Sequence, residues 1–445
     1  MRWYRAREYL LASLWFVPIL CVLGGVALST VTIAIDRSRG TSIVPRSLSG
    51  DPDAALGILT TVAVSMVTLT GLVLTITMVV VQLAMGQFTP RVLRTIVRDR
   101  PSQFAIGIFV ATFAHAMLVM REVQQPTPQD PDGFVPGLAI VIAFVLIVVS
   151  IMVLVSYVHH IGRALTVASL IDSVGDEARK LLDKLYPEER PQAPKAPDRL
   201  GRPDRLVPSA KPGVVVAVHT ADLAELASEH DVLLRIAPSV GDFVPQGAVL
   251  FEVFGQAPFD DADLLRSIAL ANERTLTHDF AFGIRMLVDV GVRAVSPAMA
   301  DPTTTIQAVD RIHDLLRQLV CRPFPSGLIA DDSGVTRLVL PTITWAGYVR
   351  LAVDELRRDA ARSLQVTRRL QAMLRDVLEI APPDRRAPLE EQLQLLEEAL
   401  PEHYAADADR RAASVPDQQG IGSGEDVSER EPRYAAASVT SFSRR

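Results

Sequence analysis

A row of small polar residues follows one face of a long apolar segment in this chain of 445 residues. The row consists of Thr61, Ser65, Thr68, Thr75 and Gln82, at spacings of 4, 3, 7 and 7 residues. These spacings place all five side chains on one side of an α-helix. Such a row could line a water-filled path through an oligomer. Alternatively, the hydroxyl groups bond to their own helix or join two helices, each bond contributing about 0.6 kcal/mol.

Three histidines lie in or beside apolar segments. His115 stands six residues before Arg121, at a depth level with Thr61, so we expect a polar contact between His115 and Thr61. An ionisable group inside a membrane span is a functional hypothesis by default, here proton or ion handling. A neutral imidazole near the interface costs little, however, and is the interpretation that we prefer. His159 and His160 are adjacent, and neighbouring side chains on a helix point about 100° apart. They would chelate a metal poorly, so we expect an interfacial role for them.

A second candidate group lies further along the chain, in a segment with helical periodicity. Its members are Gly283, Arg285, Asp289, Gly291, Arg293 and Asp301. The two arginines stand four residues before and after Asp289, so one carboxylate lies between two guanidinium groups on a single face. The two glycines occupy a neighbouring face, where a partner helix can approach closely, and Asp301 precedes Pro302 as a helix N-cap does. This group is either a solvated ladder of ion pairs or a contact for assembly or for a ligand.

Signatures of catalysis are missing from the sequence. There is no phosphate-binding G-x-x-x-x-G-K-[ST] motif, no G-x-S-x-G nucleophile elbow and no H-E-x-x-H zinc motif. His278 and Asp279 have no nucleophile or metal partner at a recognisable spacing, and neither Cys21 nor Cys321 has a companion at metal-ligand spacing. We therefore expect no enzymatic activity, no catalytic residue, no metal and no cofactor.

The polar candidates in the first part of the chain lie on four charge-poor segments, which we expect to be membrane spans. Their predicted ranges are residues 10–35, 55–88, 101–120 and 135–158. The 26 residues of the first segment would form a helix of about 39 Å, longer than the ~30 Å hydrocarbon core. A signal peptide is the alternative for this segment, but its apolar run is too long and lacks a clear cleavage site.

Arginines beside the spans predict the orientation. Seven arginines precede the first span or lie between the second and third, whereas four lie in the opposing loops, where acidic residues balance them. Because basic residues next to a span remain on the cytoplasmic side, we expect both termini in the cytoplasm of a bacterium. We therefore expect a multi-pass protein located in the cytoplasmic (inner) membrane.

The pattern of the remaining chain predicts a soluble domain of helices and strands after the α-helical membrane domain. The expected ranges are the membrane domain at 1–165, a helix and Pro-rich linker at 166–210, a β-rich module at 211–256, a helical domain at 257–403 with a hairpin at 326–340, and a disordered tail at 404–445. The fold class is thus a four-span helical domain followed by an α+β cytoplasmic domain. The β-rich module is expected to be barrel-sandwich-like.

The stretch "SVGDFVPQGAVLFEV" in that module resembles half of a lipoyl or biotinyl barrel, because a Gly-Asp turn, a second glycine turn and a closing strand follow in the usual order. Such carrier domains modify a lysine in a hairpin. Here Lys211 precedes the first strand, so a covalent cofactor is not expected. A binding or docking platform is the better interpretation.

Longer motifs resemble an uncharacterised bacterial membrane-protein family, domain of unknown function 2254. They include "RWYRAREYLLASLWFVP", "VQLAMGQFTPRVLR" and "VDVGVRAVSPAMADP", so the resemblance covers most of the chain. The family pattern has Gln where this chain has His278 and Asn where it has Ala300. The resemblance implies membrane location and carries no activity that could be transferred.

Two functions remain open at this level. The first is an oligomeric channel or transporter whose second span lines the path, with His115 near the outer mouth and a cytoplasmic domain that assembles or gates it. The second is a membrane-anchored binding or signalling protein whose β-rich module recruits a partner or ligand. The expected partners are the lipid bilayer, other copies of the chain in a homo-oligomer and an unidentified small ion or ligand, with no nucleic acid.

Overall fold

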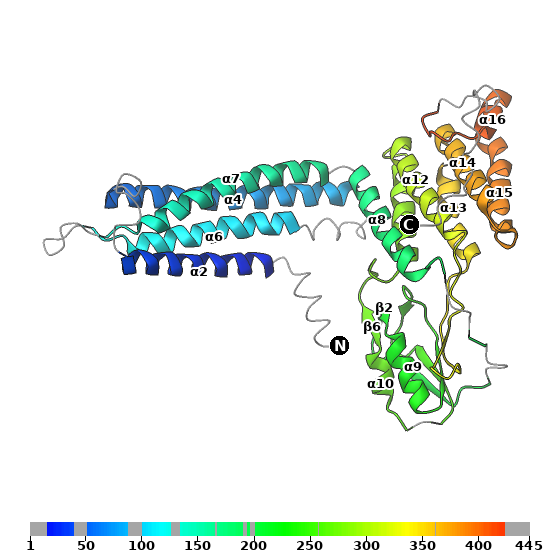
Figure 1. Ribbon diagram of the computed structural model, residues 1–445. Helices are drawn as coiled ribbons and strands as arrows, with labels where there is room; N and C mark the ends of the chain where they lie inside the picture. Colours follow the sequence, from blue (N-terminus) through cyan, green and yellow to red (C-terminus); the bar gives the residue numbers. More distant parts are fainter. Residues whose placement is uncertain are drawn as a thin grey trace, which may run out of the picture. The chain divides into compact units, whose positions relative to one another are not determined.

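The structure is a computed structural model that describes residues 16–39, 51–87, 100–125, 134–164, 167–189, 194–195, 201–256, 258–360 and 362–422. Two compact units make up the chain, Met1–Ser169 and Leu170–Arg445 (Figure 1). The first unit is helical and the second combines helices with two small sheets. This agrees with the predicted order of a helical membrane domain followed by a mixed domain.

Four long helices form the first unit and lie side by side (Figure 1). They are α2 (Phe16–Arg39), α4 (Pro52–Gln87), α6 (Arg100–Glu122) and α7 (Gly137–Ala164). Each contains a stretch long and apolar enough to cross a membrane: Phe16–Ser38, Pro52–Gln82, Pro101–Glu122 and Gly137–Gly162. Helix α6 packs against all three others. Helices long and apolar enough to span a membrane therefore lie at all four predicted positions, although residues 10–15 of the first predicted span and residue 88 of the second lie outside the described residues.

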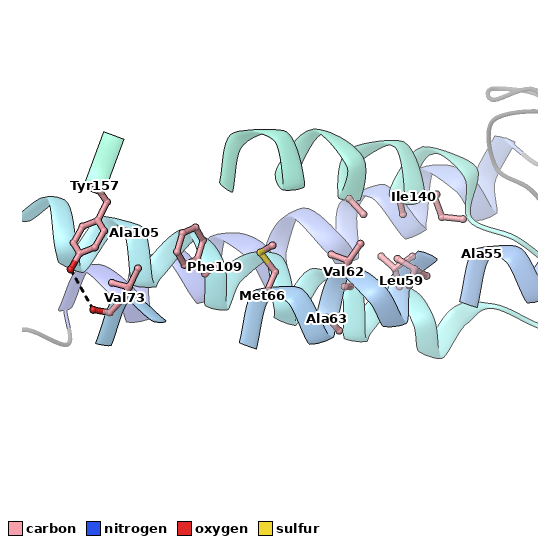
Figure 2. Packing of buried hydrophobic residues seen from close by; sticks show 14 of the residues in the cluster. Ala55, Leu59, Val62, Ala63, Met66, Val73, Ala105, Phe109, Ile140 and Tyr157 are labelled. Atoms are coloured by element: carbon pink, nitrogen blue, oxygen red, sulfur yellow. Dashed lines mark hydrogen bonds between the residues drawn. The ribbon is translucent and has the colours of Figure 1, made fainter. Parts of the chain in front are cut away.

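The core of this unit consists of apolar side chains at helical spacing. From α4, one row turns inward: Ala55, Leu59, Val62, Met66, Leu69, Val73, Ile76 and Val80. Figure 2 shows part of this row packed against Phe109 of α6 and Ile140 of α7. Near the other end of the row, the Tyr157 hydroxyl donates to the Val73 carbonyl at 3.3 Å and lies 2.8 Å from Thr77 Oγ1. The bundle therefore buries apolar side chains together with a few paired polar groups.

Large apolar side chains also cover the outside of this bundle. Met78, Met152 and Val155 are 61%, 60% and 65% exposed. A water-soluble unit rarely presents so continuous an apolar surface, whereas hydrocarbon chains accommodate it without cost. The outside of the bundle thus suits a lipid environment.

Two sheets organise the first half of the second unit. The order of the five-stranded sheet is β1 (Arg205–Pro208), β5 (Val249–Phe254), β3 (Leu233–Ile236), β8 (Thr336–Val339) and β7 (Leu328–Ala330). The three-stranded sheet contains β4 (Phe243–Val244), β2 (Gly213–Val218) and β6 (Ile268–Ala271). Only the β3–β8 pair is parallel among these strands. Strands β7 and β8 form an antiparallel hairpin within residues 326–340.

The β-rich segment at 211–256 does not form its sheets alone. Strand β5 pairs with β1, strand β2 with β6 and strand β3 with β8, and each of these three partners lies outside the segment. Helices α9 (Thr220–Glu229) and α10 (Asp261–Arg266) accompany the sheets. Because the pairing draws in strands up to residue 339, this module is part of a larger sheet domain.

Helices form the rest of the second unit. They are α8 (Val167–Leu185), α11 (Phe280–Ala294), α12 (Pro302–Leu319), α13 (Trp345–Ala360), α14 (Leu364–Ile380), α15 (Ala387–His403) and α16 (Asp407–Ser414), with a 3-10 turn η2 at Pro383–Arg385. Helix α11 is buried on nearly all sides and packs against α12 and α13. Its N-cap is Asp279, whose carboxylate accepts the Phe282 N–H at 2.9 Å.

The C-terminal segment differs from the predicted disordered tail. Residues 407–414 form α16, and the following loop is fastened to α14 because Arg368 Nε donates to the Val415 carbonyl at 2.9 Å. Asp417 is fully buried and accepts the N–H groups of Gln419 and Gly420. The segment is polar, so its composition resembles a tail, but its bonds to a distant helix hold it in place. Residues 423–445 of the predicted tail lie outside the described residues.

Candidate functional site

The polar row of α4 faces away from the bundle. Thr61, Ser65, Thr68, Thr75 and Gln82 are all exposed. The three threonine hydroxyls donate to carbonyls of their own helix, four residues earlier, at 2.8, 3.0 and 2.8 Å. Each hydroxyl oxygen keeps lone pairs that can accept a further hydrogen bond. The three threonines therefore bond within their own helix and still present acceptors to the outside of the bundle.

The outward face of α4 has a more regular pattern than the hydroxyl groups alone indicate. Every residue of the following row is exposed: Gly57, Thr61, Val64, Thr68, Gly71, Thr75, Met78 and Gln82. The spacings alternate between 4 and 3, and the row is displaced by two residues from the inward apolar row. Among the described residues, nothing outside the adjoining backbone of α4 lies within 4 Å of a Cβ built on Gly57 or Gly71. We call these eight residues the outer row of α4.

A repeat of 3.5 residues is the spacing with which one helix packs along another. On α4 the inward row meets this requirement inside the bundle, and the outer row repeats it on the opposite side. The sequence analysis found the hydroxyl groups but missed Gly57 and Gly71, which complete the pattern. The signal that would have found them is the alternating spacing itself.

Helices α2 and α6 meet through a ladder of small residues. The opposed pairs are Cys21 with Gly107, Gly25 with Ala111, and Ser29 with His115. A Cβ built on Gly25 would lie 2.8 Å from the Ala111 carbonyl oxygen, and one built on Gly107 would lie 2.8 Å from Cys21 Sγ. Because both helices repeat the contact every four residues, a single face of each is used. This ladder was not anticipated from the sequence, although "CVLGGVALS" and "GIFVATFAH" contain it.

His115 lies at the end of that ladder and is fully buried. Its Nδ1 is 2.8 Å from Ser29 Oγ, and its Nε2 is 3.0 Å from the carbonyl oxygen of Ala139, in the first turn of α7. The predicted contact with Thr61 is wrong, because Thr61 lies on the outer row and bonds to Gly57 of its own helix. The two side chains face different directions, since His115 lies inside the bundle and Thr61 on its outside.

Asp36 completes the polar group at this end of the bundle. It is 4% exposed, and its two carboxylate oxygens accept the N–H groups of Leu138 and Ala139, each at 3.1 Å. A carboxylate on α2 therefore caps the N-terminus of α7, where free N–H groups and the helix dipole favour negative charge. Sequence reasoning treated Asp36 as a loop residue that balances nearby arginines. Its position seven residues after Ser29, hence on the same face of α2, was the available signal.

The candidate group of the second unit is engaged within the chain. Arg285 forms an ion pair with Asp289 at 2.6 Å and donates two hydrogen bonds to Glu355 of α13, one of them at 2.6 Å. The bond to Glu355 raises the pKa of Arg285, and the bond from Arg285 lowers the pKa of Glu355. Arg293, near the end of α11, is half-buried. The pairing of Arg285 joins α11 to α13.

The two glycines of α11 accept neighbouring helices of the same chain. A Cβ on Gly283 would lie 2.9 Å from Ala178 Cβ of α8, and one on Gly291 would lie 2.8 Å from Leu356 Cδ2 of α13. Asp301 is the N-cap of α12, since its side chain accepts the N–H of Thr304 at 3.2 Å. The structure thus gives Gly283, Gly291 and Asp301 a role in packing this unit.

A histidine–carboxylate pair that the sequence analysis missed lies between α12 and α14. His313 Nε2 is 2.8 Å from Asp376 Oδ2, and His313 Nδ1 is 2.9 Å from Arg369 Nη2. Because a guanidinium group only donates, Nδ1 accepts and Nε2 carries the hydrogen. Burial lowers the pKa of His313 against the opposing effect of Asp376. Both ring nitrogens are occupied, so this arrangement fastens two helices and leaves no nitrogen for general base catalysis.

Metal-ligating side chains are scattered in the described part of the chain. No group of three His, Cys, Asp or Glu side chains there lies close enough together to hold a metal ion. His278 and Asp279 are adjacent, and Asp279 serves as the N-cap of α11. Burial raises the pKa of Asp279, with the Phe282 N–H acting in the opposite direction.

Comparison with known proteins identifies the family. The family model described as "Predicted membrane protein (DUF2254)" matches residues 12–376. The chain belongs to the DUF2254 family. An uncharacterized protein of Mycobacterium bovis is 31% identical over 413 residues, which cover 91% of this chain and 79% of that relative. Uncharacterized proteins of two Mycobacterium tuberculosis strains are 31% and 30% identical over the same lengths, and no solved structure matches.

Membership of DUF2254 confirms the resemblance seen in the sequence and establishes a membrane protein with four apolar helices. One departure from the pattern that the resemblance implies is Ala300, where Asn is expected. Ala300 has φ of 49°, in the left-handed region that Asn tolerates better than Ala. The Asn that the resemblance implies at this position would suit the backbone conformation, at a turn that ends one residue before the Asp301 cap.

Proposed function

We propose that this DUF2254 protein is a homo-oligomer of the bacterial cytoplasmic membrane in which the outer rows of α4 from neighbouring subunits face each other and line a path for a small ion or polar solute. Both termini lie in the cytoplasm, and the second unit assembles or gates the path. The single observation that carries the proposal is the exposure of the whole outer row on a helix whose apolar row is already buried.

The composition of the outer row argues for a protein partner in place of lipid. Lipid tails and leucine side chains are equally apolar, so helices in a membrane associate through close packing and polar contacts. Gly57 and Gly71 permit close approach, and Thr61, Thr68 and Thr75 add hydroxyl oxygens at the same face. A second copy of α4 offers the same 3.5-residue repeat, and symmetric assembly brings identical faces together.

The same row offers water a polar surface. The threonine hydroxyls keep free acceptor capacity after bonding to their own helix, and Gln82 adds an amide at the exposed end. His115 does not belong to this path, because it is buried inside the bundle. The proposal therefore separates two groups that the sequence analysis had combined, and it assigns no catalysis and no cofactor.

Cysteine cross-linking tests the assembly. In a Cys21→Ala, Cys321→Ser background, Thr75→Cys in native membranes should be cross-linked into dimers by a bifunctional maleimide, because facing rows place equivalent side chains across the path from each other. Leu74→Cys is the matched control, since Leu74 is 52% exposed at the same depth but lies outside the outer row. Equal cross-linking of both variants would contradict the proposed interface.

Flux measurements test the path. Purified protein in liposomes should conduct small ions or polar solutes, and a Thr75→Val, Gln82→Leu double variant should reduce the rate because it replaces acceptors with apolar groups. Cross-linking of Thr75→Cys together with absence of flux would support assembly without a path.

The second candidate function is a membrane-anchored binding protein, favoured by one observation. Phe243 is the first residue of β4, directly after the Gly-Asp turn, and is 65% exposed. This much exposure is unusual for a large aromatic side chain in a soluble domain. A pull-down with the full-length protein should recover a partner that Phe243→Ser loses. Recovery of the same material by both variants would count against this function.

A further inference from the structure

The buried polar group at the Asp36 end of the bundle has the capacity to bind one more proton. A carbonyl oxygen only accepts hydrogen bonds, so the 3.0 Å contact with the Ala139 carbonyl requires hydrogen on Nε2 of His115. The state of Nδ1 then depends on Ser29, whose oxygen lies 2.8 Å away.

Ser29 has one hydroxyl hydrogen and two acceptors within reach. Its Oγ is 2.8 Å from the Gly25 carbonyl oxygen and 2.8 Å from His115 Nδ1. When the imidazole is neutral, Ser29 can donate either to the Gly25 carbonyl or to His115 Nδ1, and the contact that it does not serve lacks a hydrogen. When the imidazole is protonated, Nδ1 donates to Ser29 and Ser29 donates to Gly25. The protonated form therefore satisfies all three contacts without movement of a heavy atom.

A buried carboxylate and this histidine contact the same residue of α7. Asp36 accepts the N–H of Ala139, and His115 donates to the carbonyl of the same residue, so Ala139 links the two groups. Among the side chains that the structure describes, no cation pairs with Asp36, and the adjacent Arg37 pairs with Glu122. A buried carboxylate without a cation stabilises a positive charge nearby.

The other helices add little charge around His115. Helix α7 has no acidic or basic residue between Gly137 and Val158, and α4 has none between Ala54 and Gln87. At the start of α4, Asp53 is exposed and accepts a hydrogen bond from Gln125. On α6, Arg121 and Glu122 follow one to two turns after His115. Asp36 is thus the carboxylate most directly linked to the imidazole.

We propose that His115, Ser29 and Asp36 form a proton-binding site that joins α2, α6 and α7. Binding of a proton converts the Ser29–His115 contact into a charge-assisted hydrogen bond, which is stronger than a neutral one, and tightens the contact of α2 with α6. The site is separate from the outer row of α4, so the proposal stands whether or not that row lines a path.

The test uses ¹⁵N-histidine-labelled full-length protein in lipid nanodiscs and nitrogen NMR across a pH series. The spectrum contains eight histidines, and loss of one signal in His115→Gln assigns the site. At high pH, His115 should be the neutral tautomer with hydrogen on Nε2, and on acidification it should become doubly protonated. In Asp36→Asn, the proton affinity should fall about tenfold or more. In Ser29→Ala, which removes only a neutral partner, it should fall less.

Asp53→Asn is the matched control and should leave the titration of His115 unchanged. A neutral form with hydrogen on Nδ1, or equal proton affinity in wild type and Asp36→Asn, would overturn the proposal. If a variant does not fold, the wild-type spectrum still decides, since the signal can be assigned by its coupling to ¹³C-labelled alanine carbonyls. A wild-type His115 that stays neutral until the protein unfolds in acid also refutes the site.

Discussion

Substitution of Gly25 tests whether the ladder between α2 and α6 sets the spacing of these helices. A methyl group at this position would lie 2.8 Å from the Ala111 carbonyl oxygen and 3.1 Å from the Ala111 Cα. Both contacts are with the backbone of α6, so no side-chain rotation can relieve them. The helices must separate by roughly 0.6 Å to reach ordinary contact distance.

The expected cost of Gly25→Ala is about 1–3 kcal/mol, the range for overpacking a close contact. The separation should also lengthen the Ser29–His115 hydrogen bond one turn away, which is 2.8 Å in the structure. Gly24→Ala is the matched control, because no described residue outside the adjoining turns of α2 lies within 4 Å of a Cβ built there. It should be neutral or stabilise the helix by up to about 1 kcal/mol, the difference in helix propensity between Ala and Gly.

The assay is thermal unfolding of the full-length protein in detergent micelles, followed by loss of near-UV circular dichroism. Gly25→Ala should unfold at a lower temperature than wild type, and Gly24→Ala should not. An equal or higher unfolding temperature for Gly25→Ala would refute the inferred packing of α2 on α6. The larger Gly25→Leu should be worse than Gly25→Ala if the clash is the cause.

Three further predictions concern the second unit, each measured by thermal unfolding of the full-length protein. Ala300→Asn should stabilise the protein by up to about 1 kcal/mol, because Ala is strained at positive φ, and the exposed neighbour Met299→Asn should not. Asp301→Ala should destabilise it by about 1 kcal/mol, the usual cost of losing an N-cap; no loss would mean that Thr304 finds another partner. Arg285 lowers the pKa of Glu355 in the folded protein. The ion pair therefore contributes fully to the free energy of unfolding above the pKa of an unfolded Glu, about 4.3, and this contribution is lost as the pH falls through the lower pKa of the folded state. Glu355→Gln should therefore lose less stability than wild type across that acidic window, and identical acid dependence of the two proteins would contradict the ion pair.

Much of the membrane unit could be predicted because composition and spacing are local properties. Four charge-poor segments predict four helices, and the polar positions of α4 share a face for the same reason. Asp301 followed by Pro302 predicts a helix start, which the structure confirms. Each of these inferences needs only the geometry of one element.

The contact partners of a side chain were harder to predict than the face of the helix on which it lies. The sequence analysis assigned Thr61 to His115 as a partner, whereas Ser29 and Ala139 are its neighbours. The glycines of α11 indicated close packing, yet only the structure shows that Ala178 and Leu356 fill those positions. Periodicity fixes the direction in which a side chain points along its own helix, and it carries no information about which distant element lies there.

The sequence by itself determined four apolar helices and the shared face of the polar residues of α4, because hydrophobic pattern and helical spacing act within a single segment, and its longer motifs indicated the family. Only the tertiary structure decided which face of α4 is covered, and it brought Ser29, Asp36 and His115 together from helices that are separated in sequence. The physical reason is that a buried polar group must find its partner wherever the packing of the chain supplies one, and that choice is made between elements and not within them.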